Sequence, residues 1–218
     1  MSTSTPSLPL TDLEKKAKIH AILCTTGFLI FLPIGVLVAR YTRTFTNKWW
    51  TAHAVIQLLI SAPVIFAGWT LGHQTADTLG LGHFIDTHQK TGLSLLVLYV
   101  VQLLLGLVVH FLKLPWFRGR RPLQNYVHVL LGLVIFIVAA FQVHYGLYTE
   151  WNVALGGLHK VPQSAKNAWL AFIIIFWFLY IAGMAMLPRQ VKQEQRAMAE
   201  RKSDHVALKD SPGKQAEE

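Results

Sequence analysis

The sequence predicts an all-α integral membrane protein, folded as a bundle of five transmembrane helices. Of its 218 residues, 53% are hydrophobic and 14% are charged, whereas a soluble domain carries about 25% charged residues. Five apolar stretches are long enough, at about 20 residues each, to cross a hydrocarbon layer of roughly 30 Å as helices. Only helices and closed barrels satisfy the backbone in lipid, and no strand-like alternation competes. The composition therefore excludes disordered and collagen-like classes, and the lipid bilayer is the first expected partner.

The apolar stretches divide the chain into three parts. We expect helices at roughly 19–39, 51–72, 91–112, 126–147 and 167–187, which make 19–187 the transmembrane domain. Residues 1–18 are expected to be disordered and contain no cleavable signal peptide. Residues 188–218 form a mixed-charge tail, expected to begin as a surface helix and then fray.

Basic residues lie beside the apolar stretches, which favours membrane orientation over a nucleic-acid partner as the reason for the net charge of +9. Lys and Arg in alternate flanking segments sum to 14 and 6. This bias places the N-terminus outside or in a lumen and the C-terminus in the cytosol, although Lys15, Lys16 and Lys18 oppose it. The membrane is expected to be the plasma membrane or an endomembrane.

Four of the ten histidines fall in the first turns of an apolar span: His20, His53, His88 and His128. Ionisable groups are costly there and are usually functional. Because neighbouring spans alternate in direction, His20 and His88 share the outer half of the bilayer, and His53 and His128 share the inner half. Two neutral imidazoles from different helices suit the two axial positions of a haem iron. For any single histidine, a hydrogen-bonded or interfacial imidazole is the alternative.

The third and fourth spans repeat the pattern H-x3-G-x9-Q-x3-G with every offset equal to 40 residues. At 100° per residue, the four positions line one stripe of each helix. Such a stripe serves either close helix packing or clearance for a flat porphyrin, so the glycines are candidate cofactor-binding residues. The repeats are His88, Gly92, Gln102 and Gly106, and His128, Gly132, Gln142 and Gly146.

The other candidate ligands are weaker. His73 and His144 each point roughly 160° from the histidine that begins their span, so we expect them to face away. His110 shares the stripe of His88 but lies at the membrane boundary, where it is the main rival of His128. Cys24 is the single cysteine and is expected to pack rather than ligate. Zinc and metal transport are disfavoured because the spans hold no suitable carboxylate.

Several segments resemble the cytochrome b561 family, in particular fungal five-helix domains often found behind a DOMON-type extracellular domain. The similarity covers about residues 18–190, and no DOMON domain is expected in this chain. The segments are HAILCTTGFLIFLPIGVLVARY from His20, WWTAHAVIQ around His53, DTHQKTGLSLLVLYVVQLLLGLVVHF around His88, RPLQNYVHVLLGLVIFIVAAFQVHYG around His128, and LPRQ after the fifth span.

The resemblance implies two b-type haems within the first four helices, ligated by His20 with His88 and by His53 with His128. It also implies electron transfer from a cytosolic, ascorbate-like donor to an outer acceptor such as semidehydroascorbate, ferric iron or a partner haem domain. The chain would then be an electron-transfer oxidoreductase, and a ferric reductase is one form of it. The ascorbate-associated segments of six-helix members are not evident.

Two other functions stay open at this point. A transporter or proton pathway would use titrating histidines, with Gln102 and Gln142 lining a wet route. A structural subunit would use the glycine stripes for packing alone. A cytosolic basic collar suits haem propionates or an anionic donor, but membrane anchoring explains it equally well. A homodimer and the donor-binding residues are left open. The collar comprises Arg40, Lys48, Arg118, Arg120 and Arg121.

Overall fold

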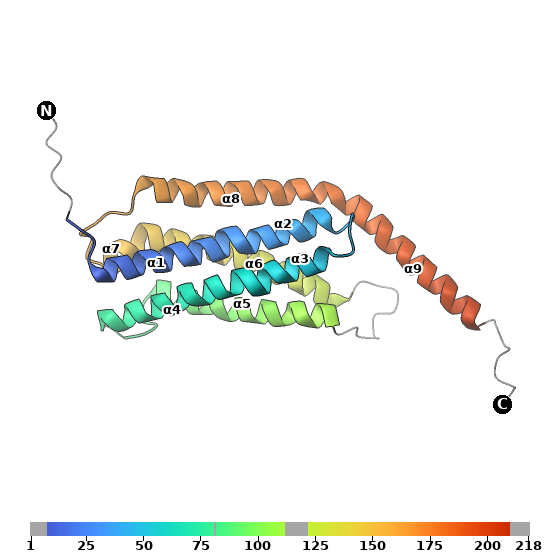
Figure 1. The fold of residues 1–218 in the computed structure, drawn as a ribbon, viewed down its shortest axis with the longest axis horizontal. Helices are drawn as coiled ribbons and strands as arrows, with labels where there is room; N and C mark the ends of the chain where they lie inside the picture. The colour runs from blue at the N-terminus through green and yellow to red at the C-terminus, as the bar shows by residue number, and fades with distance from the viewer. Residues whose placement is uncertain (1–7, 81, 112–121, 210–218) are drawn as a thin grey trace, which may run out of the picture.

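The computed structural model describes residues 8–80, 82–111 and 122–209, which form a bundle of long helices (Figure 1). In this part of the chain, five helices are long and apolar enough to cross a membrane. Each predicted span lies on one of them, so the predicted fold class is confirmed and the protein is a multi-pass membrane protein. The five helices are Asp12–Thr42, Trp49–Leu79, Thr87–Phe111, Leu123–Ala154 and Gln163–Ala197.

Several of these long helices are composed of shorter elements. The elements are α1 (Asp12–Thr26), η1 (Gly27–Phe31), α2 (Leu32–Thr42), α3 (Trp49–Val55), η2 (Ile56–Ser61), α4 (Ala62–Leu79), α5 (Thr87–Phe111), α6 (Leu123–Tyr145), η4 (Gly146–Glu150), α7 (Trp151–Ala154), α8 (Gln163–Gly183), η5 (Met184–Met186) and α9 (Leu187–Lys209).

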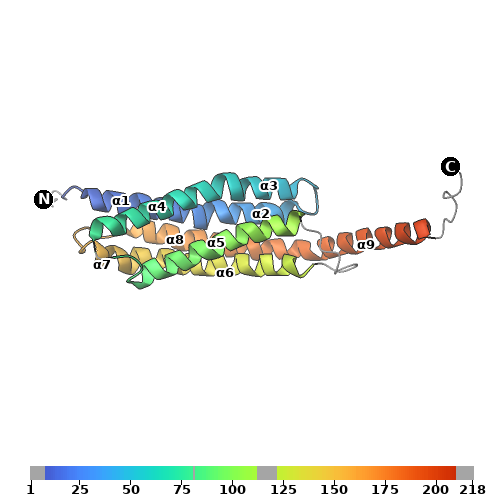
Figure 2. The ribbon, with the colours of Figure 1, turned by 90° about the horizontal axis from the view of Figure 1, so that it is seen from below.

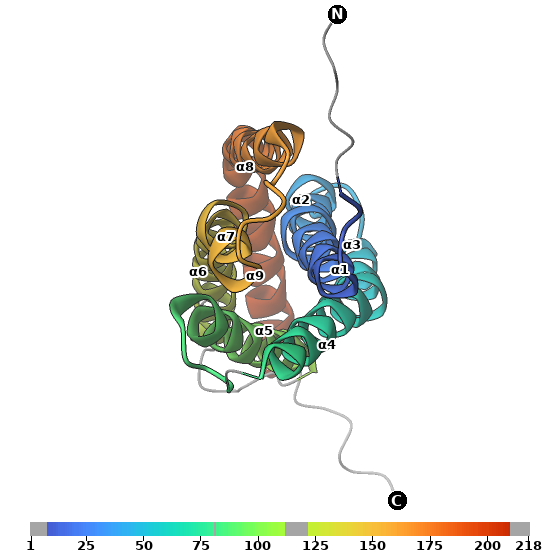
Figure 3. The same ribbon diagram turned by 90° about the vertical axis from the view of Figure 1, so that its left-hand side faces the viewer.

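Consecutive spans run antiparallel, and the fifth lies beside the other four. Seen from the N-terminal end, α8 packs on the side formed by α2 and α6, whereas α4 and α5 lie across the bundle (Figure 3). The helix α9 runs past the bundle at the opposite end (Figure 2). The centre is closely packed, since Ile65, Ile135 and Ala139 have no exposed surface and Tyr99 is only 1% exposed.

The first helix begins at Asp12, so the expected disorder of residues 1–18 is wrong for residues 12–18. A capping box explains the early start: the Glu14 amide donates to Thr11 Oγ1 at 3.2 Å, and the Thr11 amide donates to Glu14 Oε2 at 2.8 Å. The tail begins as a helix, as expected, because α9 continues from the fifth span to Lys209. An Arg43–Glu194 ion pair at 3.0 Å joins α9 to the α2–α3 turn.

Wide π-helical turns interrupt the first two spans directly before a proline. In η1 the Leu32 amide donates to Gly27 O, five residues back, and Pro33 follows. In η2 the Ala62 amide donates to Gln57 O, and Pro63 follows. A proline lacks the amide donor and its ring clashes with the carbonyl four residues earlier. The wide turn relieves both problems.

Candidate functional site: two histidine pairs

The first histidine pair, His20 and His88, joins α1 to α5 near the N-terminal end of the bundle. The ring centroids lie 6.2 Å apart, and the ring planes are inclined at 82°. Nδ1 of His20 lies 2.7 Å from the carbonyl oxygen of Gly68 on α4. Nδ1 of His88 lies 3.1 Å from the side-chain nitrogen of Gln142 on α6. Four helices thus converge on this pair.

The second histidine pair, His53 and His128, joins α3 to α6 toward the other end. Its ring centroids are 6.3 Å apart, with an interplanar angle of 80°, so it repeats the geometry of the first pair. Nδ1 of His53 lies 2.8 Å from the carbonyl oxygen of Gly35 on α2. Nδ1 of His128 is buried and has no hydrogen-bond partner within the described residues. The structure therefore brings together the histidines that the sequence paired.

This spacing fits one metal ion between each pair. Two imidazole nitrogens bound to an ion from opposite sides lie about 4 Å apart, and their ring centroids about 6 Å apart, because each bond is about 2 Å long. The observed separations, 6.2 and 6.3 Å, match this value. Where Nδ1 donates to a backbone carbonyl, as geometry allows for His20 and His53, Nε2 is free to bind a metal.

The glycine stripes of α5 and α6 face each other. A methyl group at Gly106 would lie 3.2 Å from Cε1 of His128, and one at Gly146 would lie 3.3 Å from Cε1 of His88. Gly92 and Gly132 face Gln142 and Gln102 in the same way, each at 3.0 Å from the amide nitrogen. Each glycine therefore makes room for a side chain of the other helix, which favours the packing interpretation. Contact of these glycines with a porphyrin stays a prediction.

Both repeated glutamines bind the backbone at a histidine of the neighbouring helix. Gln142 Nε2 donates to His88 O at 2.7 Å, and Gln102 Nε2 donates to His128 O at 2.8 Å. The amide oxygens of both are buried and lack a partner in the described chain. Each glutamine thus ties the first turns of a histidine-bearing helix to the helix beside it. The glutamines therefore support histidine positioning rather than a wet route.

Three residues of this site were missed by the sequence analysis. A methyl group at Gly72 would lie 2.6 Å from Cε1 of His20, and one at Gly68 would lie 3.0 Å from the backbone nitrogen of Cys24. These glycines let α1 and α4 approach closely, and their four-residue spacing was the signal that could have found them. Gln57, one turn after His53, likewise donates its side-chain Nε2 to a backbone carbonyl of the neighbouring helix, Leu32 O, at 3.0 Å.

Residues 19–153 match the family model described as eukaryotic cytochrome b561. This match covers more than half of the chain and includes all four paired histidines. The chain belongs to the cytochrome b561 family. Membership implies a b-type haem, and both histidine pairs have the separation that such a group requires.

Relatives within this family are moderately similar in sequence. A cytochrome b561 and DOMON domain-containing protein of Arabidopsis thaliana is 28% identical over 166 residues, which are 74% of this chain and 37% of the relative. A transmembrane ascorbate-dependent reductase CYB561 homolog of Caenorhabditis elegans is 22% identical over 213 residues, 89% of this chain and 76% of the relative. A plasma membrane ascorbate-dependent reductase of Mus musculus is 28% identical over 127 residues, 54% of this chain and 41% of the relative.

The chain spans less than two fifths of the length of the two plant relatives that it matches over 166 and 152 residues, at 37% and 38%.

In this b561 chain, a cavity of about 190 Å³ opens beside the first histidine pair. His20, His88 and Glu150 line it, together with His73 and His83. The expectation that His73 faces away is therefore wrong. The π-helical turn η2 lies between His53 and His73, so the angle calculated for a regular α-helix does not apply.

The remaining candidates have other contacts. His110 stacks on Trp50 with 3.7 Å between ring centroids, which leaves His128 as the ring that faces His53. His144 packs against Trp169 of α8 at 5.0 Å. From the basic collar, Arg40 donates to the hydroxyl of Tyr180 at 3.4 Å, while Arg118, Arg120 and Arg121 lie outside the described residues.

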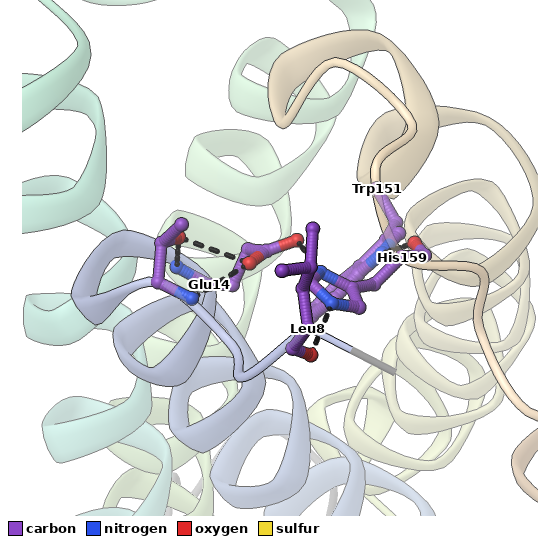
Figure 4. Close-up of polar contacts among 5 residues, drawn as sticks. Leu8, Glu14, Trp151 and His159 are labelled. Carbon is purple, nitrogen blue, oxygen red and sulfur yellow. Dashed lines mark hydrogen bonds and ion pairs between the residues drawn. The ribbon is translucent and has the colours of Figure 1, made fainter. Parts of the chain in front are cut away.

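A polar clasp closes the N-terminal end next to the cavity (Figure 4). His159, in the loop before α8, has Nδ1 at 2.7 Å from Glu14 Oε1 and Nε2 at 2.8 Å from Leu8 O. Trp151, which also lines the cavity, donates to His159 O at 2.6 Å. Only a protonated imidazole donates to both acceptors, so the hydrogen bond to Glu14, followed by that to Leu8, raises the pKa of His159.

Proposed function

We propose that this cytochrome b561 transfers electrons across the membrane, with one b-type haem held by His20 and His88 and a second by His53 and His128. The observation that carries the proposal is the repetition of one ring geometry at two depths, 6.2 Å at 82° and 6.3 Å at 80°. When bound, a b-type haem would supply an iron that exchanges one electron, and the two histidines of each pair would hold it and leave no position open for oxygen chemistry.

The chain's own residues orient the imidazoles. Gly68 O and Gly35 O lie at hydrogen-bond distance from Nδ1 of His20 and His53, so each carbonyl fixes a ring and keeps its proton away from Nε2. Such outer contacts raise ligand basicity and set the ring plane. Gln142 Nε2 lies 3.1 Å from Nδ1 of His88, whereas Gln102 donates to the backbone carbonyl of His128 and does not contact its ring nitrogen.

The two pairs lie at different depths with a dry, packed section between them. On α5, His88 belongs to the first pair, and Gly106 marks the depth of the second pair because it faces His128. Gly106 lies 18 residues after His88, which places the two pairs roughly 27 Å apart along the helix. Tyr99 fills the section between, with its ring 5.7 Å from Phe28 and 6.3 Å from Phe66. Fully buried Ile65 and Ile135 exclude water there, which suits electron passage and disfavours ion passage.

We place the donor on the cytosolic side, at the α9 end, and the acceptor at the N-terminal end, where the cavity opens. The alternating excess of Lys and Arg supports this orientation. Relatives named as ascorbate-dependent reductases support an ascorbate-like donor. Semidehydroascorbate, ferric iron or the haem of a partner protein is then the acceptor, in a plasma membrane or endomembrane.

Haem content tests the proposal directly. The purified full chain is expected to hold about two haems and, once reduced, to show the sharp spectrum of low-spin bis-histidine iron. In vesicles that enclose ascorbate, the protein is expected to reduce an impermeant acceptor added outside, and vesicles with the His20→Ala variant serve as the matched control. Protein free of haem after expression with ample haem supply would overturn the proposal.

A further inference from the structure

A second group of potential ligands lies outside the two histidine pairs. His73 and Asp77 occupy adjacent turns of α4, and His83 follows in the loop before α5. One ligand atom from each of the three residues lies within 4.8 Å of the other two. The His73 and His83 rings stack with centroids 4.1 Å apart, and the Asp77 carboxylate bridges them at 3.3 Å and 2.8 Å.

The loop is shaped to bring His83 back over Asp77. Gly80 ends α4 in the left-handed conformation at φ +67°, and Gly82 adopts φ +95°. Phe84, beside His83, has φ +57°, which is uncommon for a residue with a side chain. Its amide donates to the Gln89 side chain, so the first turn of α5 holds the strained position. Such strain clusters at sites that bind ligands.

We propose that His73, Asp77 and His83 bind one divalent transition-metal ion of the zinc class at the N-terminal end of the bundle. Two imidazoles and one carboxylate are a set that such ions favour, and the set leaves further positions for water or an anion. The expectation that the spans hold no carboxylate for zinc is wrong at Asp77, because the second span extends to Leu79. The three side chains are 37%, 53% and 33% exposed, so an ion reaches them from solvent. Small side-chain rotations bring the three atoms onto one ion, since a zinc–ligand bond is about 2 Å long.

The site lies at the edge of the cavity that adjoins the first histidine pair, because His73 and His83 line that cavity with His20 and His88. Trp69 lies beside it, with its ring 5.4 Å from that of His73. The proposal does not rest on haem binding: its three ligands are separate from the four paired histidines, and its test reads metal content rather than electron transfer.

Zinc titration of the full chain tests the proposal. The protein is purified with its haem, and a chelator first removes any other bound metal. Calorimetry is expected to show one site of high affinity, with one zinc per chain after desalting. His83→Gln keeps a hydrogen-bond donor for Asp77 but removes the ring nitrogen, and Asp77→Asn keeps the shape but removes the charge. Each substitution is expected to weaken binding by more than about tenfold.

His110→Ala is the matched control, since it removes a histidine at the opposite end of the bundle. The control is expected to bind zinc as the parent does, and unchanged helical circular dichroism verifies that each variant is folded. The proposal would be overturned if His83→Gln left the zinc affinity unchanged, or if His110→Ala lowered the affinity equally. Asp77 would then serve only to bind the two histidine rings. The absence of a site in the parent protein would overturn the proposal as well.

Discussion

The two histidine pairs have the same internal geometry but different surroundings. Their ring separations differ by only 0.1 Å, from 6.2 to 6.3 Å. The first pair has Nδ1 contacts on both rings, adjoins a cavity of about 190 Å³ and lies beneath the polar clasp. In the second pair, Nδ1 of His128 has no partner among the described residues, and the nearby His110 is stacked on Trp50.

This contrast separates two requirements of the site. The distance between the imidazoles is fixed by helix packing, through glycines that admit the opposing rings, and it is therefore repeated. Access from outside the bundle is fixed by the loops and helix ends, and it differs between the pairs. The differences give three ways to test whether the pairs act as separate units.

The largest effect is expected from removing one axial ligand. His88→Ala is expected to lose the haem of the first pair, about half of the total, and to keep the spectrum of the second. His128→Ala is expected to do the reverse. Haem-to-protein ratios and reduced spectra of the purified variants measure both outcomes.

His110→Ala is the control for these substitutions and is expected to retain both haems. If it lost the haem of the second pair instead, the assignment of His128 would be wrong. Complete haem loss in His88→Ala would show that the pairs do not bind independently.

A smaller effect is expected from adding one methyl group beside a ring. Gly72→Ala would place Cβ 2.6 Å from the His20 ring, a contact that must shift, and overpacking costs about 1–3 kcal/mol. Gly106→Ala would place it 3.2 Å from the His128 ring, where the helix-propensity gain of about 1 kcal/mol offsets the crowding. We expect Gly72→Ala to lower the melting temperature and the haem content of the first pair, and Gly106→Ala to change little. Equal losses in the two variants would contradict this ranking.

The smallest effect concerns the polar clasp, which covers the first pair alone. Because folding raises the pKa of His159, its contribution to stability is fully present below the pKa of an unfolded histidine and is lost as pH rises through the raised value. The melting temperature of the parent is expected to exceed that of His159→Gln at about pH 5, and the gap is expected to close by about pH 9. A gap that widened with rising pH would show that the neutral ring stabilises the clasp.

The sequence was sufficient for the five spans and for the pairing of the four histidines. Hydrophobic length determines the spans, and alternating direction determines which histidines share a depth. The stripe of α5 and α6 was also predictable, because α5 and the part of α6 that carries most of the stripe are regular α-helix, in which 100° per residue holds.

The first two spans were less predictable because their helices are not regular. The turns η1 and η2 change the angular relation between residues on either side, so the positions of Gly35, Gly72 and His73 could not be calculated from α-helical spacing. The capping box at Thr11 was present in the sequence but was obscured by the polar composition around it. The contact between Glu14 and His159 joins residues 145 positions apart, which no local pattern predicts.

The π-helical turn η1 also sets a limit on how this chain tolerates length changes. The hydrogen bond from the Leu32 amide to Gly27 O spans five residues, so this turn contains one residue more than an α-helical turn. Deleting a residue there would restore the regular winding and swing Gly35 by about 100° relative to His20. His20 belongs to the first pair, and Gly35 O contacts His53 of the second pair. After the deletion, the helix could keep only one of these two residues directed at its pair. The extra residue thus lets one helix contribute to both histidine pairs.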